Sequence, residues 1–149
     1  MSKIETAESL ANLTFSLLAR CQEKEAWLAE KHRLLEAEFK CLRLFGVDEK
    51  LSNKEIAKRM NLCEGRLTRI MDGLVQKGYM KREIDKSDRR NMKLSLFRRG
   101  KMLTNKLNKA FVEIHSEILQ EIDISQHESL ITAMGNLNYA VEKWLQRPR

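Results

Sequence analysis

Apolar residues in the N-terminal part of the chain recur every three or four positions, the spacing that aligns them on one side of an α-helix. They are Leu10, Leu13, Leu17 and Leu18. Ser2 and Glu5 precede them with the spacing of a capping box, in which each side chain bonds the other residue's backbone amide. The pattern predicts a helix from about Lys3 to about Ala29.

Two shorter helices are predicted next. The first runs from about Glu36 to Phe45, and Gly46 is placed to end it in a left-handed conformation. The second follows Ser52, whose hydroxyl can cap the helix while Glu55 reaches back to the cap amide. The residues that this helix buries are predicted to be Ile56, Ala57 and Met60.

A break at residues 61–63 leads into a helix with two different sides, which extends to about Lys77 and is stopped by Gly78. Its apolar side is predicted to contain Leu67, Ile70, Met71, Leu74 and Val75. Its outer side presents Glu64, Gly65, Arg66, Thr68, Arg69, Asp72 and Gln76.

After this helix the apolar period shortens from near 3.6 to 2, which is typical of strands. Residues 79–84 and 92–96 are predicted to form two strands, and the wholly polar residues 85–91 to form the tip of a hairpin. Helix, short turn, helix and hairpin in this order predict a winged helix-turn-helix.

Two long amphipathic helices are predicted after Gly100. The first carries Leu103, Leu107, Phe111, Ile114, Ile118 and Ile122. The second opens with Ser125 and Glu128 as a further capping box and carries Leu130, Met134, Leu137, Val141 and Leu145. These helices have more apolar surface than the central module needs for its own core. The excess favours packing against a second subunit. The alternative is that they pack back onto their own module.

These elements predict a mainly α-helical fold with a small β-wing. Residues 1–34 and 101–149 would form a dimerisation region around a winged helix-turn-helix at residues 35–100. The 149 residues contain a single proline and six glycines, which favours long helices over a turn-rich fold. Because no segment has the apolar length of a membrane span or of a signal peptide, we expect a soluble, cytoplasmic protein without a membrane partner.

The positive charge is concentrated in one central block. Residues 54–101 hold 15 lysines and arginines and six acidic residues, a net charge of +9, whereas the whole chain has a formal charge of +7. The flanks together therefore carry −2. Such a block can be a solvated face, but here it coincides with the predicted winged helix and favours a polyanionic partner such as nucleic acid.

The predicted hairpin tip suits a minor groove, whose potential is negative. Arg89 and Arg90 can enter it, and Asp88 can orient one guanidinium by a charge-assisted bond. Cations that could follow the phosphates are Lys77, Lys81, Arg82 and Lys86. For any single one of these, a solvated surface charge is an equally good interpretation.

At these residues the sequence resembles the multiple-antibiotic-resistance-regulator (MarR) family of winged-helix transcription factors. The resemblance runs from Leu35 to Leu103, and its most specific part is residues 78–90, followed by Leu94-Ser95-Leu96 and Gly100. The family's wing pattern of Asp, any residue and Arg falls on Asp88 and Arg90. The resemblance implies that Arg90 enters the minor groove while Asp88 holds it.

The resemblance also implies base or phosphate contacts on the predicted recognition helix. The implied residues are Gly65, Arg66, Thr68 and Arg69. Arginine can bond guanine bidentately and threonine can contact a base or a phosphate, so these residue types suit the role. Members of the family are homodimers joined by their terminal helices, and most repress genes or release them on meeting a small-molecule effector.

Redox, metal and catalytic chemistry receive little support. Some relatives sense peroxides through a cysteine in the first helix, where Cys21 stands without flanking tyrosines; Cys63, at a helix N-terminus beside Arg66, is the second redox candidate. An inert thiol is the favoured interpretation of both. The three histidines are dispersed and no nucleotide loop or nucleophile motif occurs, so we expect no metal, no cofactor and no enzyme activity.

The sequence therefore predicts a homodimeric, sequence-specific regulator that binds double-stranded DNA at half-sites about 10 bp apart. The favoured role of this regulator is that of a repressor. One alternative is an architectural or RNA-binding winged helix without sequence preference. Another is a protein-interaction scaffold whose basic face meets an acidic protein.

Overall fold

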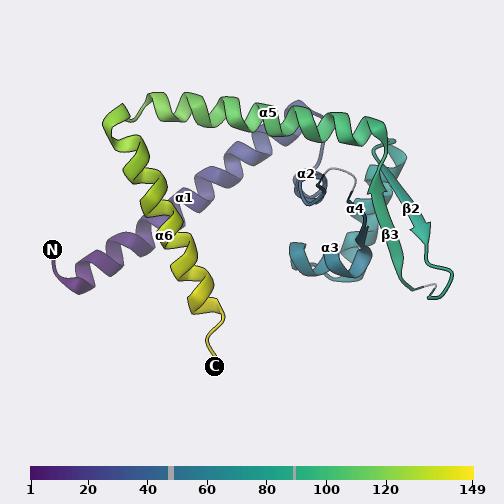
Figure 1. Ribbon diagram of the computed structural model, residues 1–149, viewed down its shortest axis with the longest axis horizontal. Coiled ribbons are helices and arrows are strands. Elements are labelled where there is room, and N and C mark those ends of the chain that lie inside the picture. Colours follow the sequence, from purple (N-terminus) through teal and green to yellow (C-terminus); the bar gives the residue numbers. More distant parts are fainter. Residues whose placement is uncertain (47–48, 89) are drawn as a thin grey trace. The chain divides into compact units, whose positions relative to one another are not determined.

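A computed structural model describes residues 1–46, 49–88 and 90–149, and confirms a mainly helical fold with a small sheet (Figure 1). The helices are α1 (Lys3–Lys31), α2 (Glu36–Leu42), α3 (Asn53–Met60), α4 (Glu64–Gln76), α5 (Arg98–Gln120) and α6 (His127–Leu145). The strands are β1 (Leu51–Ser52), β2 (Met80–Ile84) and β3 (Met92–Leu96). The described residues form two compact units, 1–105 and 106–149. The predicted three-part division into functional regions stays a prediction.

Helix starts follow the local capping chemistry in the first unit. The Ser2 hydroxyl accepts from the Glu5 amide and the Glu5 carboxylate accepts from the Ser2 amide, which completes the predicted box at α1. At α3, Ser52 Oγ accepts from the Glu55 amide at 3.1 Å, but the predicted return bond from the Glu55 side chain is not formed. The break after α3 is confirmed, since Asn61 adopts a left-handed φ of 54°.

Several predicted helix ends were wrong. α2 ends at Leu42 instead of Phe45, because its last carbonyls are satisfied by a tight turn in which the Leu44 and Phe45 amides donate back to the helix. Gly46 has no left-handed φ; its amide donates to the Glu49 carboxylate at 2.6 Å. Gly78, with a φ of 82°, is a left-handed glycine as predicted.

The helices at the C-terminal end also begin differently from the prediction. α5 starts at Arg98, two residues before Gly100. Ser125 does not cap α6; instead the Asp123 carboxylate accepts from the Ser125 amide and hydroxyl, both at 3.1 Å. This bonding forms a short 3-10 turn over Ile124–Gln126, and α6 follows from His127.

The sheet has three strands in the order β1-β3-β2, all antiparallel. The predicted hairpin is confirmed, with Met80 opposite Leu96 and Ile84 opposite Met92. The third strand was missed because β1 has two residues, too few to show an alternating pattern. By pairing with β3, β1 joins the hairpin to the start of α3.

The core of the first unit lies among α1, α2, α3, α4 and the sheet. Its fully buried side chains include Leu28, Phe39, Leu42, Ile56, Leu67, Met71, Leu74, Met80 and Leu94. The predicted inner side of α4 is confirmed for three of these, while Ile70 and Val75 are half-buried. Met60, predicted to be buried, is also half-buried.

The terminal helices leave apolar side chains in solvent. Leu13 and Leu18 of α1 are 68% and 58% exposed, and α6 buries none of its residues. On α5, Leu103, Leu107 and Phe111 are buried as predicted, whereas Ile118 is exposed. No helix in the described part of the chain combines the length and apolarity that crossing a membrane requires.

Candidate nucleic-acid interface

The outer side of α4 is exposed over its whole length, as predicted. Glu64, Gly65, Arg66, Thr68, Arg69, Asp72 and Gln76 all face solvent, while Leu67, Met71 and Leu74 anchor the opposite side. The Thr68 hydroxyl donates to the Glu64 carbonyl at 2.8 Å, which leaves its oxygen lone pairs and its methyl group facing outward. A Cβ at Gly65 would meet nothing within 4 Å, so the backbone here is open to close approach.

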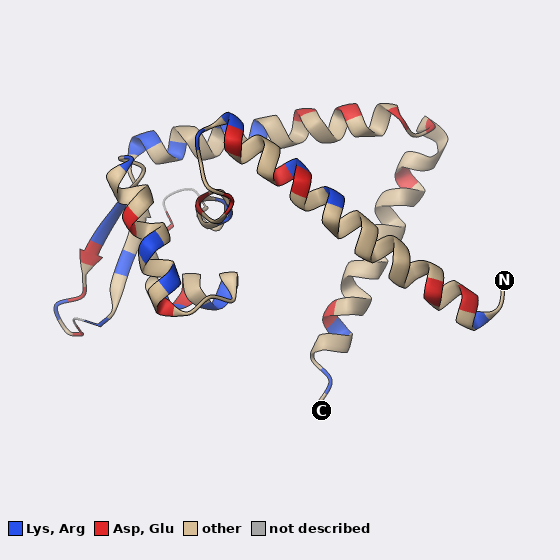
Figure 2. Ribbon diagram, turned by 180° about the vertical axis from the view of Figure 1, so that it is seen from behind, with Lys and Arg blue, Asp and Glu red and all other residues tan. Residues whose placement is uncertain are grey.

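Basic residues continue from α4 onto the hairpin. Figure 2 shows lysine and arginine segments on α4, on both long strands and at the start of α5. Arg82 of β2 forms an ion pair with Asp72 of α4 at 2.6 Å, so the outward acid of the helix is matched by a cation. This bond also links the hairpin to the helix.

The predicted phosphate-following residues on β2 have carboxylate neighbours. Lys81 lies 3.2 Å from Glu83, and Lys50 lies 3.5 Å from the same carboxylate. The hydrogen bond from Lys81 and the charge of Lys50 lower the pKa of Glu83. Both pairs are solvent-exposed and therefore weak, so a phosphate can compete for Lys81.

The hairpin tip is organised by two aspartates. Asp88 Oδ1 accepts from the Arg90 backbone amide at 3.0 Å, so it holds the backbone of Arg90. Its predicted bond to a guanidinium stays a prediction. Asp85 accepts from the hydroxyl and amide of Ser87, which lower its pKa. Lys86 and Arg90 are exposed. The predicted contact residue Arg89 lies outside the described residues.

Asn53, the first residue of α3, holds the base of the tip and was missed by the sequence analysis. It is 7% exposed; its Nδ2 donates to the Arg90 carbonyl at 3.4 Å and its Oδ1 accepts from the Met92 amide at 3.3 Å. The side chain therefore connects the helix-turn-helix to the residue expected to enter the minor groove. The one sequence feature that points to this role is an amide side chain at the start of a helix. That feature is too common to predict a specific contact.

We expect Asn53→Ala to lower the free energy of unfolding by about 1–2 kcal/mol, because it leaves the Arg90 carbonyl and the Met92 amide without their partner in a part-buried site. The Met92 amide should also exchange with solvent faster. Asn91→Ala is the matched control, since Asn91 Oδ1 is buried without a partner among the described residues. Equal losses for both variants in urea unfolding would show that Asn53 contributes no specific contact.

Lys77 has internal partners, although its side chain is 38% exposed. Its Nζ donates to Glu38 Oε1 at 2.6 Å and to the Arg33 carbonyl at 3.1 Å. Glu38 is 1% exposed and also accepts from the Leu35 amide at 2.9 Å. A Cβ at Gly73 would collide with Glu38 Oε2, which explains a glycine inside α4. The structure thus gives Lys77 an internal partner, and its phosphate contact stays a prediction.

The three cysteines occupy different environments. Burial, with a contribution from the charge of Glu38, raises the pKa of Cys41 to about 12. Cys63 is exposed at the N-cap of α4 without a side-chain capping bond, and Cys21 is half-buried with Lys24 Nζ at 3.8 Å from its sulfur. None is in a disulfide, and the described residues contain no group of three potential metal ligands.

These environments predict selective thiol modification. At pH 8 we expect a maleimide to modify Cys63 first, and Cys41 only after unfolding, because thiolates react and a thiol with a pKa of about 12 is almost entirely protonated. Peptide mass mapping over time measures this order. Modification of Cys41 in the folded protein at the rate of Cys63 would contradict the assigned burial.

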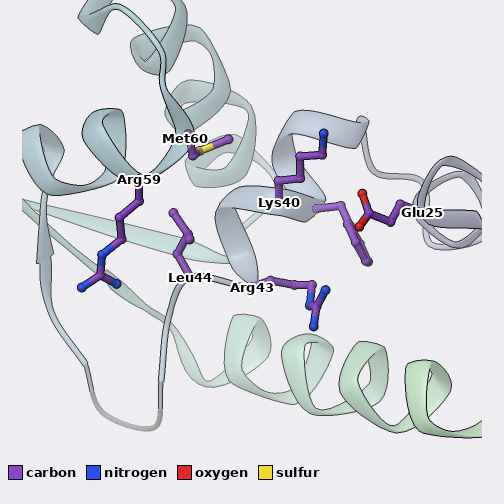
Figure 3. Close-up of a pocket in the computed structure, with 7 residues that line it drawn as sticks. Glu25, Lys40, Arg43, Leu44, Arg59 and Met60 are labelled. Atoms are coloured by element: carbon purple, nitrogen blue, oxygen red, sulfur yellow. The ribbon is translucent and has the colours of Figure 1, made fainter. Parts of the chain in front are cut away.

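A cavity of about 450 Å³ lies among α1, α2 and α3. Figure 3 shows Leu44 and Met60 at its wall, while the charged ends of Lys40, Arg43 and Arg59 point in three different directions. The cations therefore do not converge on one point, and the cavity does not by itself define the chemistry of a ligand.

Comparison with known proteins finds relatives of the winged-helix part of the chain. Residues 34–92 match the family model described as MarR family. The matched segment contains α2, α3, α4 and β2, so the helix-turn-helix of this chain is similar to that of the MarR family. The chain is 29% identical over 106 residues to the HTH-type transcriptional regulator SarZ of Staphylococcus haemolyticus, a match that covers 71% of this chain and 69% of that protein.

Solved structures show the same fold over most of the chain. The apo form of MarR from E. coli superposes with a TM-score of 0.77 at 19% identity, covering 86% of this chain and 95% of that one. FabT of Streptococcus pneumoniae, solved in complex with DNA, superposes with a TM-score of 0.68 at 17% identity, covering 96% and 99%. The shared fold thus extends beyond residues 34–92.

Proposed function

We propose that this protein is a transcriptional regulator that binds double-stranded DNA through α4 and the β2–β3 hairpin. The observation that carries the proposal is the exposed outer side of α4 beside a basic hairpin, in a part of the chain that is similar to the MarR family. The relative from S. haemolyticus is named as a transcriptional regulator, and FabT, which has the same fold, was solved with DNA. We infer that α4 enters the major groove and that the hairpin enters the adjacent minor groove.

We further propose that the working unit is a homodimer. The exposed apolar residues of α1 and α6 form surfaces that a monomer leaves in water, and a second copy would cover them. Two copies would read two similar half-sites about 10 bp apart, and a cytoplasmic repressor is the simplest use of such a protein. An effector is an expectation from the family resemblance.

The hairpin's part in binding is tested by Arg90→Ala, for which we expect duplex affinity to fall about tenfold or more. The reason is that an arginine inserted in a narrow minor groove meets a strongly negative potential. Affinity for a selected duplex is measured by fluorescence anisotropy at a fixed salt concentration. Arg43→Ala is the control, since Arg43 lies on the cavity side of α2. Unchanged binding by Arg90→Ala would remove the hairpin tip from the interface.

The main alternative is a winged helix without sequence preference. It predicts equal affinity for a selected duplex and for a scrambled duplex of the same length. A regulator should prefer its own site by about a thousandfold or more at physiological salt. A competition titration with scrambled DNA separates the two functions.

A further inference from the structure

The C-terminal end of α4 is fastened to the α1–α2 turn through one ammonium group. Lys77 Nζ bonds both the Glu38 carboxylate and the Arg33 carbonyl. Arg33 follows His32, the C-cap of α1, and has a left-handed φ of 56° that non-glycine residues rarely adopt. The ammonium group therefore joins the end of α4, the first turn of α2 and the end of α1 within one compact unit.

The residues around Glu38 account for the position of both oxygens of its carboxylate. The Glu38 side chain is almost fully buried, and a buried carboxylate requires charged and hydrogen-bonding partners close by. Its first oxygen is held by Lys77 and by the Leu35 amide. Its second oxygen occupies the space that Gly73 leaves open, because any Cβ there would collide with it. Gly73 of α4 and Lys77, which directly follows this helix, thus enclose one carboxylate of α2.

We propose that the Glu38–Lys77 contact fixes the angle of α4 relative to α1, and thereby sets the half-site spacing that the protein accepts. The inference rests on the proposed function, in which α1 belongs to the dimerisation region and α4 reads DNA. In such a dimer, the two copies of α4 must be about 34 Å apart, one turn of the double helix. Lys77 is then a positioning residue, which acts on DNA only through the placement of α4.

A direct phosphate contact by Lys77 is the competing explanation, and Glu38 distinguishes the two. A buried carboxylate cannot contact DNA, so Glu38→Gln alters only the internal contact and leaves the lysine charge in place. Lys77→Met removes both the contact and the charge. Lys81→Met is the control, because Lys81 has an exposed carboxylate partner on the hairpin and no link to α1.

The first measurement needs no DNA. Nitroxide labels at exposed Cys63 and at Glu23→Cys, in a Cys21→Ser background diluted with unlabelled protein, report the distance between α4 and α1 by electron paramagnetic resonance. We expect a narrow distribution for the parent and for Lys81→Met, and a broader one for Glu38→Gln and Lys77→Met. Circular dichroism confirms that each variant is folded at the temperature used. Equal widths in all four proteins would overturn the proposal, whether or not the protein binds DNA.

The second measurement uses a duplex selected by the parent protein, with one base pair inserted or removed between its half-sites. Each step rotates one half-site by about 35°. The parent should reject both altered duplexes by about tenfold, and Glu38→Gln and Lys77→Met should reduce this discrimination to about threefold or less. If Lys77 contacts phosphate instead, Lys77→Met weakens all three duplexes equally, with a salt slope smaller by about 0.9, and Glu38→Gln changes nothing. That pattern overturns the proposal. If the parent protein binds no duplex, the proposed function is refuted, and the distance measurement alone decides the inference.

Discussion

Lys77→Met is expected to lower the free energy of unfolding by about 3 kcal/mol, the largest single effect that we expect in this chain. The substitution leaves the nearly inaccessible Glu38 carboxylate without its cation, and it also removes the donor to the Arg33 carbonyl. Removing the cation beside a buried carboxylate costs more than removing a surface charge, because the remaining charge stays buried. Since the Lys77 side chain is 38% exposed, the expected loss lies at the low end of the range for buried pairs. Urea unfolding followed by circular dichroism measures the change.

Two further variants test whether the burial of the Glu38 carboxylate causes this loss of stability. Lys81→Met breaks an ion pair of similar composition at the surface and should cost less than about 1 kcal/mol. Combining Lys77→Met with Glu38→Leu removes the buried charge and should recover a large part of the loss. If Lys77→Met and Lys81→Met lose the same stability, the Glu38–Lys77 contact does not stabilise the protein as described.

The second large effect is expected for Arg69→Ala, which should weaken binding of a selected duplex by about 1–3 kcal/mol. Arg69 is exposed on the outer side of α4, and a guanidinium that bonds guanine bidentately discriminates against other bases by this amount. The loss should come with relaxed preference at one position of each half-site. Binding to a panel of single-base variants measures both quantities.

Lys86→Ala provides the contrast for Arg69→Ala. Lys86 lies on the hairpin tip and is exposed, so its expected partner is a phosphate. Its loss should weaken binding of all base variants equally and reduce the slope of log K against log salt by about 0.9. If Arg69→Ala also weakens all base variants equally, Arg69 contacts the DNA backbone and does not read a base.

The sequence predicted the elements of the fold well where periodicity and capping agree. The bounds of α4, β2 and β3 were nearly correct, because α4 has a clear apolar side and the strands alternate. Errors occurred at ends that depend on local bonding. α2 ends early in a tight turn. The Asp123 carboxylate accepts from the Ser125 amide, so α6 begins after Ser125 and not at it.

The candidate site was predictable in outline but not in its internal bonds. Exposure of the α4 outer side follows from its periodicity, so residues such as Arg66 and Thr68 were placed correctly. The partners of Lys77 and Arg82 lie 39 and 10 positions away, and no local pattern relates them. For the same reason Gly73 had no explanation until Glu38 was seen beside it.

Selection of bound duplexes from a random pool by the purified full-length protein tests the central claim most directly. The account predicts enrichment of one approximate palindrome, with half-sites about 10 bp apart and bound by two copies of the chain. A pool that shows no enrichment after repeated rounds, or a single non-repeated site bound by one copy, would contradict it.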